Sequence, residues 1–258
     1  MTARKHQSSS EAMTIRTELQ SLSDPAKARV LAGFFKTGPG DYGEGDKFHG
    51  VVVPKIRRIV KAHRNMSAGE IRKLIHSEFH EERLTALLIL VEQYRLGDIA
   101  RKRKIYELYL ASTAYINNWD LVDLTAQHIV GAYLDGRDLS VLRQLAVSQI
   151  LWERRIAMLS TYYFIRRGDS REALRIAELL LHDPHDLIHK AVGWMLREVG
   201  KRCSLDEELR FLDDHAAAMP RTMLRYAIER LPEKLRLHYL ARRKRDRGCE
   251  EDRRQKTD

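Results

Sequence analysis

The residues best suited to chemistry in this sequence lie in the segment Tyr115–Asp123. Trp119 and Asp123 are four residues apart, so in a helix the indole and the carboxylate project from the same face. Asn118 is suited to cap that helix, and Asp120 to its first turn. The face of an indole attracts a cation and a carboxylate pairs with it, so the two side chains could hold a positively charged group. A tryptophan at helical spacing is more often part of a hydrophobic core, and that alternative stays open at this point.

Other combinations of reactive residues lack the pattern that their chemistry requires. His76 and His80 are four residues apart, but the residue directly after His76 is not the glutamate that zinc proteases have there. His182, His185 and His189 cluster without a cysteine nearby, which argues against a zinc site. The sequence contains no GxSxG nucleophile motif and no P-loop. We therefore predict neither a metal site nor a cofactor.

A glycine-rich segment from Thr37 to Gly50 interrupts the helical pattern and must be a loop. Its start, Gly38–Gly43, formally matches GxGxxG, but no strand precedes it and no βαβ pattern occurs, so a dinucleotide site is rejected. Two interpretations remain open. The segment is a long ordered loop, or it is a backbone clamp on phosphate with Lys47 nearby.

The composition favours a helical protein with a polyanionic partner. The chain of 258 residues carries 46 Lys and Arg against 36 Asp and Glu, a formal charge of +10. It has only 14 Gly and 6 Pro, fewer chain breakers than an all-β fold needs. The two cysteines, Cys203 and Cys249, form no disulfide framework, which favours a reducing compartment. No apolar run approaches ~18 residues, so no membrane span is expected.

Amphipathic helical periodicity and a regular spacing together predict a repeat fold. Leu84, Leu87, Leu88 and Val91 follow the pattern of one helical face. Steps of 35 or 36 residues separate five equivalent cations or aromatics: Arg83, Trp119, Arg155, Lys190 and Arg225. A period of about 35 residues with two helices per unit is typical of HEAT-like solenoids. We predict an all-α fold, a right-handed α-superhelix (solenoid) of HEAT-like repeats over residues 14–241, with a disordered lead (1–13) and a basic, disordered tail (242–258).

Three blocks and the loop resemble the AlkD-like DNA alkylation-repair glycosylases, over roughly residues 20 to 240. The first block is the Trp119 segment described above, and the loop start Phe35–Gly40 matches a branch of that family with a glycine-rich loop. The other two blocks are Leu151–Ala157 and His189–Glu198, and all three occur in the order that the family has. One departure is Asn118, where many relatives have an aromatic residue.

The resemblance implies a superhelix of HEAT-like repeats that removes positively charged N-alkylated purines from DNA. It maps the family's carboxylate to Asp123, its two flanking indoles to Trp119 and Trp194, and its backbone-binding arginine to Arg155. It also implies that the base need not be flipped into a pocket. Two of these positions, Trp119 and Arg155, coincide with the register obtained from the spacing.

We therefore expect a monofunctional alkylpurine-DNA glycosylase that excises N3-methyladenine and N7-methylguanine from duplex DNA in base excision repair. Five cations are expected to bind phosphate: Lys47, Arg155, Lys190, Arg197 and Arg225. We expect a monomer without an obligate protein partner, cytoplasmic in the bacterial manner and associated with the nucleoid when bound to DNA. The alternatives are a catalytically silent HEAT-repeat protein that binds nucleic acid and a protein-interaction scaffold.

Overall fold

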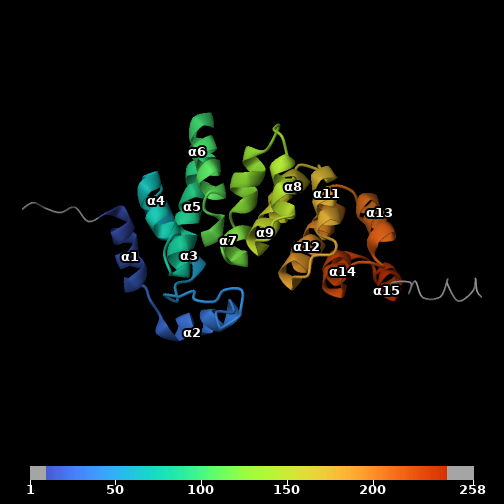
Figure 1. Ribbon diagram of the computed structural model, residues 1–258, viewed down its shortest axis with the longest axis horizontal. Helices are drawn as coiled ribbons and strands as arrows, with labels where there is room; N and C mark the ends of the chain where they lie inside the picture. The colour runs from blue at the N-terminus through green and yellow to red at the C-terminus, as the bar shows by residue number, and fades with distance from the viewer. Residues whose placement is uncertain (1–9, 243–258) are drawn as a thin grey trace, which may run out of the picture. The chain divides into compact units, whose positions relative to one another are not determined.

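The computed structural model describes residues 10–242, and this part of the chain is helical without a strand (Figure 1). The predicted all-α class is confirmed. The basic tail lies outside the described residues apart from Arg242, and so does the lead up to residue 9. The first helix, α1 (Glu11–Ser21), starts inside the segment that the sequence predicts to be disordered. It does so because the Ser10 side chain caps it and the side chain of Ala12 is buried.

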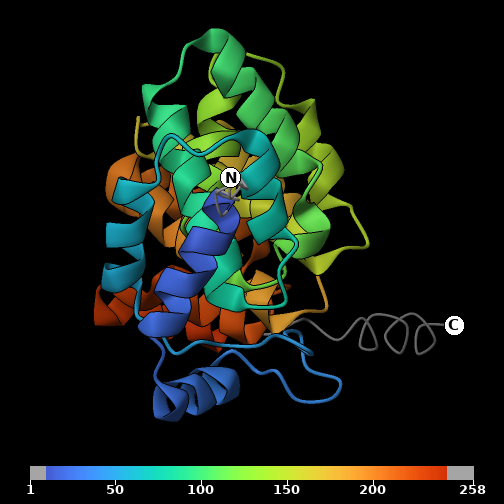
Figure 2. The same ribbon diagram turned by 90° about the vertical axis from the view of Figure 1, so that its left-hand side faces the viewer.

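The described residues divide into two compact units between Arg137 and Asp138. In the first unit, α5 (His80–Leu96) is the central helix, and it packs against helices α3, α4 and α6. The other elements of this unit are α1, α2 (Pro25–Phe34), α3 (Val53–Ala62), α4 (Ala68–Ile75), α6 (Ile99–Leu110), α7 (Trp119–Asp123) and a π-helical turn (Gln127–Gly131). Within this unit, α2 lies across the ends of the other helices rather than alongside them (Figure 1 and Figure 2).

The second unit is arranged around another long helix, α12 (Asp186–Arg202), which packs against α9, α13 and α14. Its remaining helices are α8 (Ser140–Ala146), α9 (Leu151–Ser160), α10 (Tyr162–Ile165), α11 (Arg171–Leu179), α13 (Leu205–His215), α14 (Arg221–Ala227) and α15 (Glu233–Ala241). Arg155, Lys190 and Arg225 are each the fifth residue of their helix, as a repeat with two helices per unit requires. Arg83 is instead the fourth residue of α5 and Trp119 the first of α7, so the predicted equivalence of the five positions holds only in the second unit.

Gly193 allows α12 and α14 to approach closely. A Cβ at this position would meet the carbonyl oxygen of Met223 at 2.4 Å and the Cβ of Tyr226 at 2.5 Å. Both neighbours belong to α14, and one of them is backbone that has no freedom to move aside. The glycine of the third sequence block is therefore explained by helix packing.

We expect Gly193→Ala to lower the free energy of unfolding by roughly 1–3 kcal/mol, because the added methyl group overpacks the α12–α14 contact. Gly69→Ala is the control, since nothing lies within 4 Å of its Cβ position in α4. The control should be neutral or slightly stabilising, as alanine favours the helix. Urea titrations of the two variants and the wild type measure the difference. Equal midpoints for all three proteins would contradict the close approach.

Glu208 on α13 is a buried carboxyl group without a hydrogen-bond partner for its Oε1 atom among the described residues. Its side chain occupies the space beside Gly200, where a Cβ would collide with it. Burial raises the pKa of Glu208 to about 8, although the charge of Arg197 opposes this. The folded protein therefore holds a proton here near neutral pH that the unfolded chain would release.

This raised pKa makes folding stability fall as the pH rises from about 4.5 to about 8, because the folded state binds more protons than the unfolded state in that window. Glu208→Gln keeps the shape without the charge, so it should gain stability over the wild type with rising pH, by roughly 1–3 kcal/mol at pH 9. Glu233→Gln, at an exposed position in α15, is the control. Urea unfolding at pH 5, 7 and 9 tests this, and a gain that does not depend on pH would count against it.

Candidate functional site

The Trp119 segment folds as the sequence predicts. Helix α7 consists of Trp119–Asp123, so the indole and the carboxylate lie one helical turn apart, and both side chains are half-buried. Asn118 caps the helix: its Oδ1 accepts a hydrogen bond from the N–H of Trp119 at 2.8 Å. The Asn118 side chain is fully buried.

Trp119 lies against two aromatic rings from the end of α2. The Phe34 ring contacts the indole edge-on with centroids 5.7 Å apart, and the Phe35 ring lies 5.2 Å from it. Phe35 is buried, whereas Phe34 is 61% exposed. The indole is thus the inner edge of an aromatic surface rather than part of a closed core. Sequence reasoning linked neither phenylalanine to Trp119, because nothing in the spacing relates α2 to α7.

Asp123 lies close to Tyr109 of α6. The Tyr109 hydroxyl is buried and shares a hydrogen bond of 2.8 Å with the Thr125 hydroxyl. Burial raises the pKa of Tyr109, and the nearby negative charge of Asp123 raises it further while the bond to Thr125 opposes the shift. The phenol therefore remains neutral beside the Asp123 carboxylate.

Asp120 lies in the first turn of α7, as the sequence predicts, and it also has a partner that the sequence does not indicate. Its Oδ2 pairs with Nε2 of His80 at 2.9 Å in the buried interior of the first unit. Burial alone would lower the pKa of His80, but the charge and hydrogen bond of Asp120, together with Asp46, raise it to about 9. His80 is therefore an imidazolium near neutral pH.

The second unit carries Trp194 on a basic face of α12. Lys190, Trp194 and Arg197 follow the i, i+4, i+7 spacing of one helical face. The Trp194 ring is half-buried, with its centroid 6.0 Å from that of Tyr162. Tyr162 begins α10, and no sequence signal links it to Trp194. The indole thus lies between two cations, each of which pairs with a carboxylate.

The five predicted phosphate-binding cations differ in how accessible they are. Arg155 is only 5% exposed and donates a hydrogen bond to the carbonyl oxygen of Leu187. Arg197 is largely enclosed and pairs with Glu229. Three others are more open to solvent: Arg225 is exposed on α14, Lys190 pairs with Asp186 at 2.7 Å, and Lys47 pairs with Glu78 at 2.8 Å. Their contact with phosphate stays a prediction.

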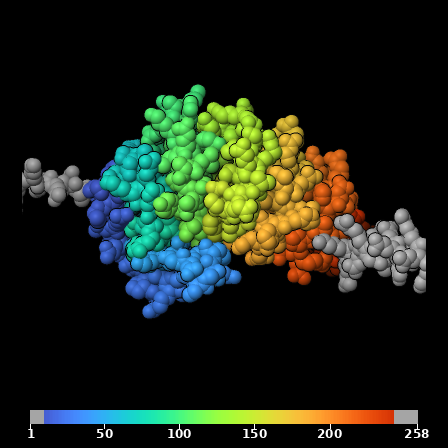
Figure 3. Space-filling model, viewed as in Figure 1, coloured from blue at the N-terminus to red at the C-terminus, as the bar shows by residue number. Residues whose placement is uncertain are grey.

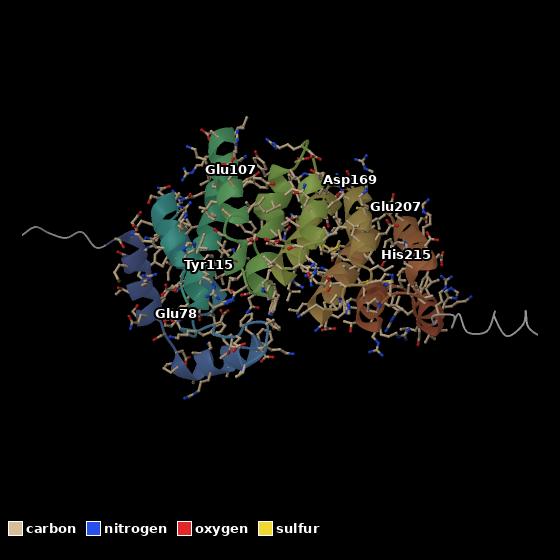
Figure 4. All side chains as sticks on the ribbon, viewed as in Figure 1. Glu78, Glu107, Tyr115, Asp169, Glu207 and His215 are labelled. Carbon is tan, nitrogen blue, oxygen red and sulfur yellow. The ribbon has the colours of Figure 1, made fainter. Side chains whose placement is uncertain are left out.

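The glycine-rich loop has few backbone amides left to bind phosphate. The N–H groups of Asp41, Gly43, Glu44 and Asp46 donate to carbonyl groups within residues 36–43. The Gly40 N–H donates to the Glu44 carboxylate at 3.0 Å. Lys47 stands at the edge of the loop, and its partner Glu78 is labelled in Figure 4. These contacts favour the ordered-loop interpretation over the phosphate clamp.

Among residues 10–242, no group of three or more His, Cys, Asp or Glu side chains is placed to hold a metal ion. None of the helices in this range is long and apolar enough to cross a membrane.

Comparison with known proteins identifies the family of the chain. The family model described as "DNA alkylation repair enzyme" matches residues 15–231. A solved structure, a predicted DNA alkylation repair enzyme from Enterococcus faecalis, matches with a TM-score of 0.62 and 15% identity, covering 82% of this chain and 97% of that one. At that identity the structural match shows the fold alone. No curated protein sequence matches the chain. The family match spans most of the sequence, and the chain belongs to the family of DNA alkylation repair enzymes.

Proposed function

We propose that this member of the family is a monofunctional DNA glycosylase that excises positively charged N-alkylated purines, such as N3-methyladenine and N7-methylguanine, from duplex DNA. The observation that carries the proposal is helix α7, which presents an indole and a carboxylate one turn apart. Membership in a DNA alkylation repair family supplies the substrate, DNA with an alkylated base.

The chemistry of such a lesion fits these two groups. An alkylated purine with a positive charge is already a good leaving group, so its glycosidic bond breaks with cationic character developing on the sugar. The Asp123 carboxylate opposes that charge and orients the attacking water. The Trp119 ring attracts the same cation and excludes bulk water. Its half-buried position on the Phe34 and Phe35 rings holds the indole in one orientation.

The second unit adds groups of the kind that DNA binding requires. Trp194 is proposed to flank the lesion as the second indole. Of the three predicted phosphate-binding residues on α12 and α14, Lys190 and Arg225 are more open to solvent than Arg197, and they suit phosphate contacts that do not depend on sequence. To bind phosphate, Arg197 would have to break its ion pair with Glu229. Arg155 could contact a phosphate only through the small part of its side chain that solvent reaches.

We expect Asp123→Asn to fold normally and to lose base release by on the order of 10²–10³, because one electrostatic stabiliser of the transition state is removed. The measurement is free N7-methylguanine from methylated duplex DNA under single-turnover conditions. Asp135→Asn, at an exposed position in the same unit, is the control and should retain the wild-type rate. Equal rates for wild type and Asp123→Asn would refute the assignment. No release by the wild type would favour a catalytically silent DNA-binding protein.

The choice of lesion follows from the protonation states of the acids. A neutral base such as hypoxanthine needs a proton donor to leave, and Asp123 cannot be both that donor and the anion opposite the sugar. Burial disfavours ionisation of Glu198, but its hydrogen bond and charge pairing with Arg202 outweigh this and lower its pKa. Glu208 keeps its proton but is only 3% exposed, so it cannot reach a base.

We therefore expect release of N7-methylguanine and N3-methyladenine, with negligible release of hypoxanthine or uracil. Duplexes carrying each base, assayed in parallel for free base at the same enzyme excess, give the comparison. Hypoxanthine release at a rate near that of N7-methylguanine would show that a proton donor reaches the base, which is inconsistent with the proposed mechanism.

A further inference from the structure

Four consecutive residues at the start of α5, His80, Glu81, Glu82 and Arg83, are ionisable and all buried. Such side chains are almost never fully buried unless they are paired. Most of their partners come from three other segments of the first unit: the glycine-rich loop, α1 and the Trp119 segment. Contacts that converge on one helical turn in this way suggest that this turn positions those segments.

The two glutamates fix the end of the loop. The Glu81 carboxylate accepts hydrogen bonds from the backbone N–H groups of His49, Gly50 and Val51 at 2.8–3.1 Å. Glu82 pairs with Arg16 of α1 at 2.9 Å and with His49 at 3.2 Å. Gly50 must be glycine here, since its φ is +83° and a Cβ would collide with the backbone at Asp24. The loop end is therefore held through its backbone.

Arg83 and His80 hold the loop through Asp46, which also reaches the Trp119 segment. The Asp46 carboxylate pairs with Nη2 of Arg83 at 2.7 Å and lies 3.6 Å from Nδ1 of His80. Its Oδ1 accepts a hydrogen bond from Nδ2 of Asn117 at 2.9 Å. Loop, α5 and the residues leading into α7 thus share one buried carboxylate.

His80 connects this cluster directly to α7. Its Nε2 binds Asp120, the second residue of α7, while its ring stacks at 4.9 Å on both Phe35 and Phe48. Phe35 is the ring that contacts Trp119. One imidazole therefore contacts α7 through Asp120 and supports the Trp119 indole through Phe35.

The loop also fits the cap of α7. A Cβ on Gly43 would meet the carbonyl oxygens of Phe35 and Lys36 at 2.7 and 3.0 Å and the Asn118 amide at 3.4 Å. An aromatic side chain in place of Asn118 would need the space that the loop occupies at Gly43. The departure at Asn118 and the glycine-rich loop are thus matched features of this chain.

We propose that His80 is a positioning residue that locks the glycine-rich loop to α7, through Asp46 and Asp120, and thereby sets the places of Trp119 and Asp123. This gives the loop a structural role in the site. The effect on base release rests on the proposed function, whereas the effect on α7 itself does not.

The test compares His80→Gln with His63→Gln. His63 forms another histidine–carboxylate pair in the same unit, with Glu18 at 2.9 Å, and lies on neither the loop nor α7. Two readouts are measured on the full chain. The first is hydrogen exchange at the amides of Val122 and Leu124, which bond to Asn118 and Asp120. The second is single-turnover release of N7-methylguanine, measured alongside the Kd for the same duplex.

For His80→Gln we expect exchange protection in α7 and the release rate each to fall about tenfold or more, with Kd within about twofold of wild type. His63→Gln should leave both readouts near wild type. Protection in α7 equal to that of His63→Gln would overturn the proposal, even if the wild type releases no base and the proposed function fails. If His80→Gln does not fold, Asp46→Asn undergoes the same measurements, with the same result expected and the same result overturning it.

Discussion

The pairing of the charges buried at the start of α5 is the constraint on which the first unit depends. An ionised side chain inside a protein is costly unless an opposite charge and hydrogen bonds compensate it. At this turn the compensation comes from segments distant in sequence: Asp46 in the loop, Arg16 on α1 and Asp120 on α7. The cluster can therefore form only when those segments take their places, so it stabilises one arrangement of the unit.

This constraint separates two aspartates that look equivalent in the sequence. Asp120 and Asp123 lie in the same short helix, but Asp120 is neutralised by His80, whereas Asp123 lies beside a phenol that stays neutral. Asp120 thus acts within the fold, whereas Asp123 is the residue for which we propose a role opposite a cationic lesion. Figure 3 shows the loop and α2 packed against the rest of the first unit, which is the packing that the buried cluster supports.

The central feature of the second unit is the close packing of α12 against α14. The two helices approach each other at Gly193 of α12. Lys190 and Trp194, also on α12, are partly exposed to solvent. Arg155 and Arg197, which the sequence groups with the solvent-facing cations, are largely enclosed. Arginine often has this dual character, since its long stem packs while its guanidinium bonds to carbonyl or carboxylate oxygens.

The helical class could be predicted from the amino-acid sequence, because apolar periodicity is a local property that each segment carries. The i, i+4 relation of Trp119 and Asp123 could be predicted as well, since it needs only that the segment be helical. Three sets of contacts could not: Asp120 with His80, Phe34 and Phe35 with Trp119, and Glu81 with the loop backbone. Those partners lie 31 to 85 residues apart in the chain. Local periodicity shows which face of a segment is apolar, but it does not show which distant segment will cover that face or pair with its charges.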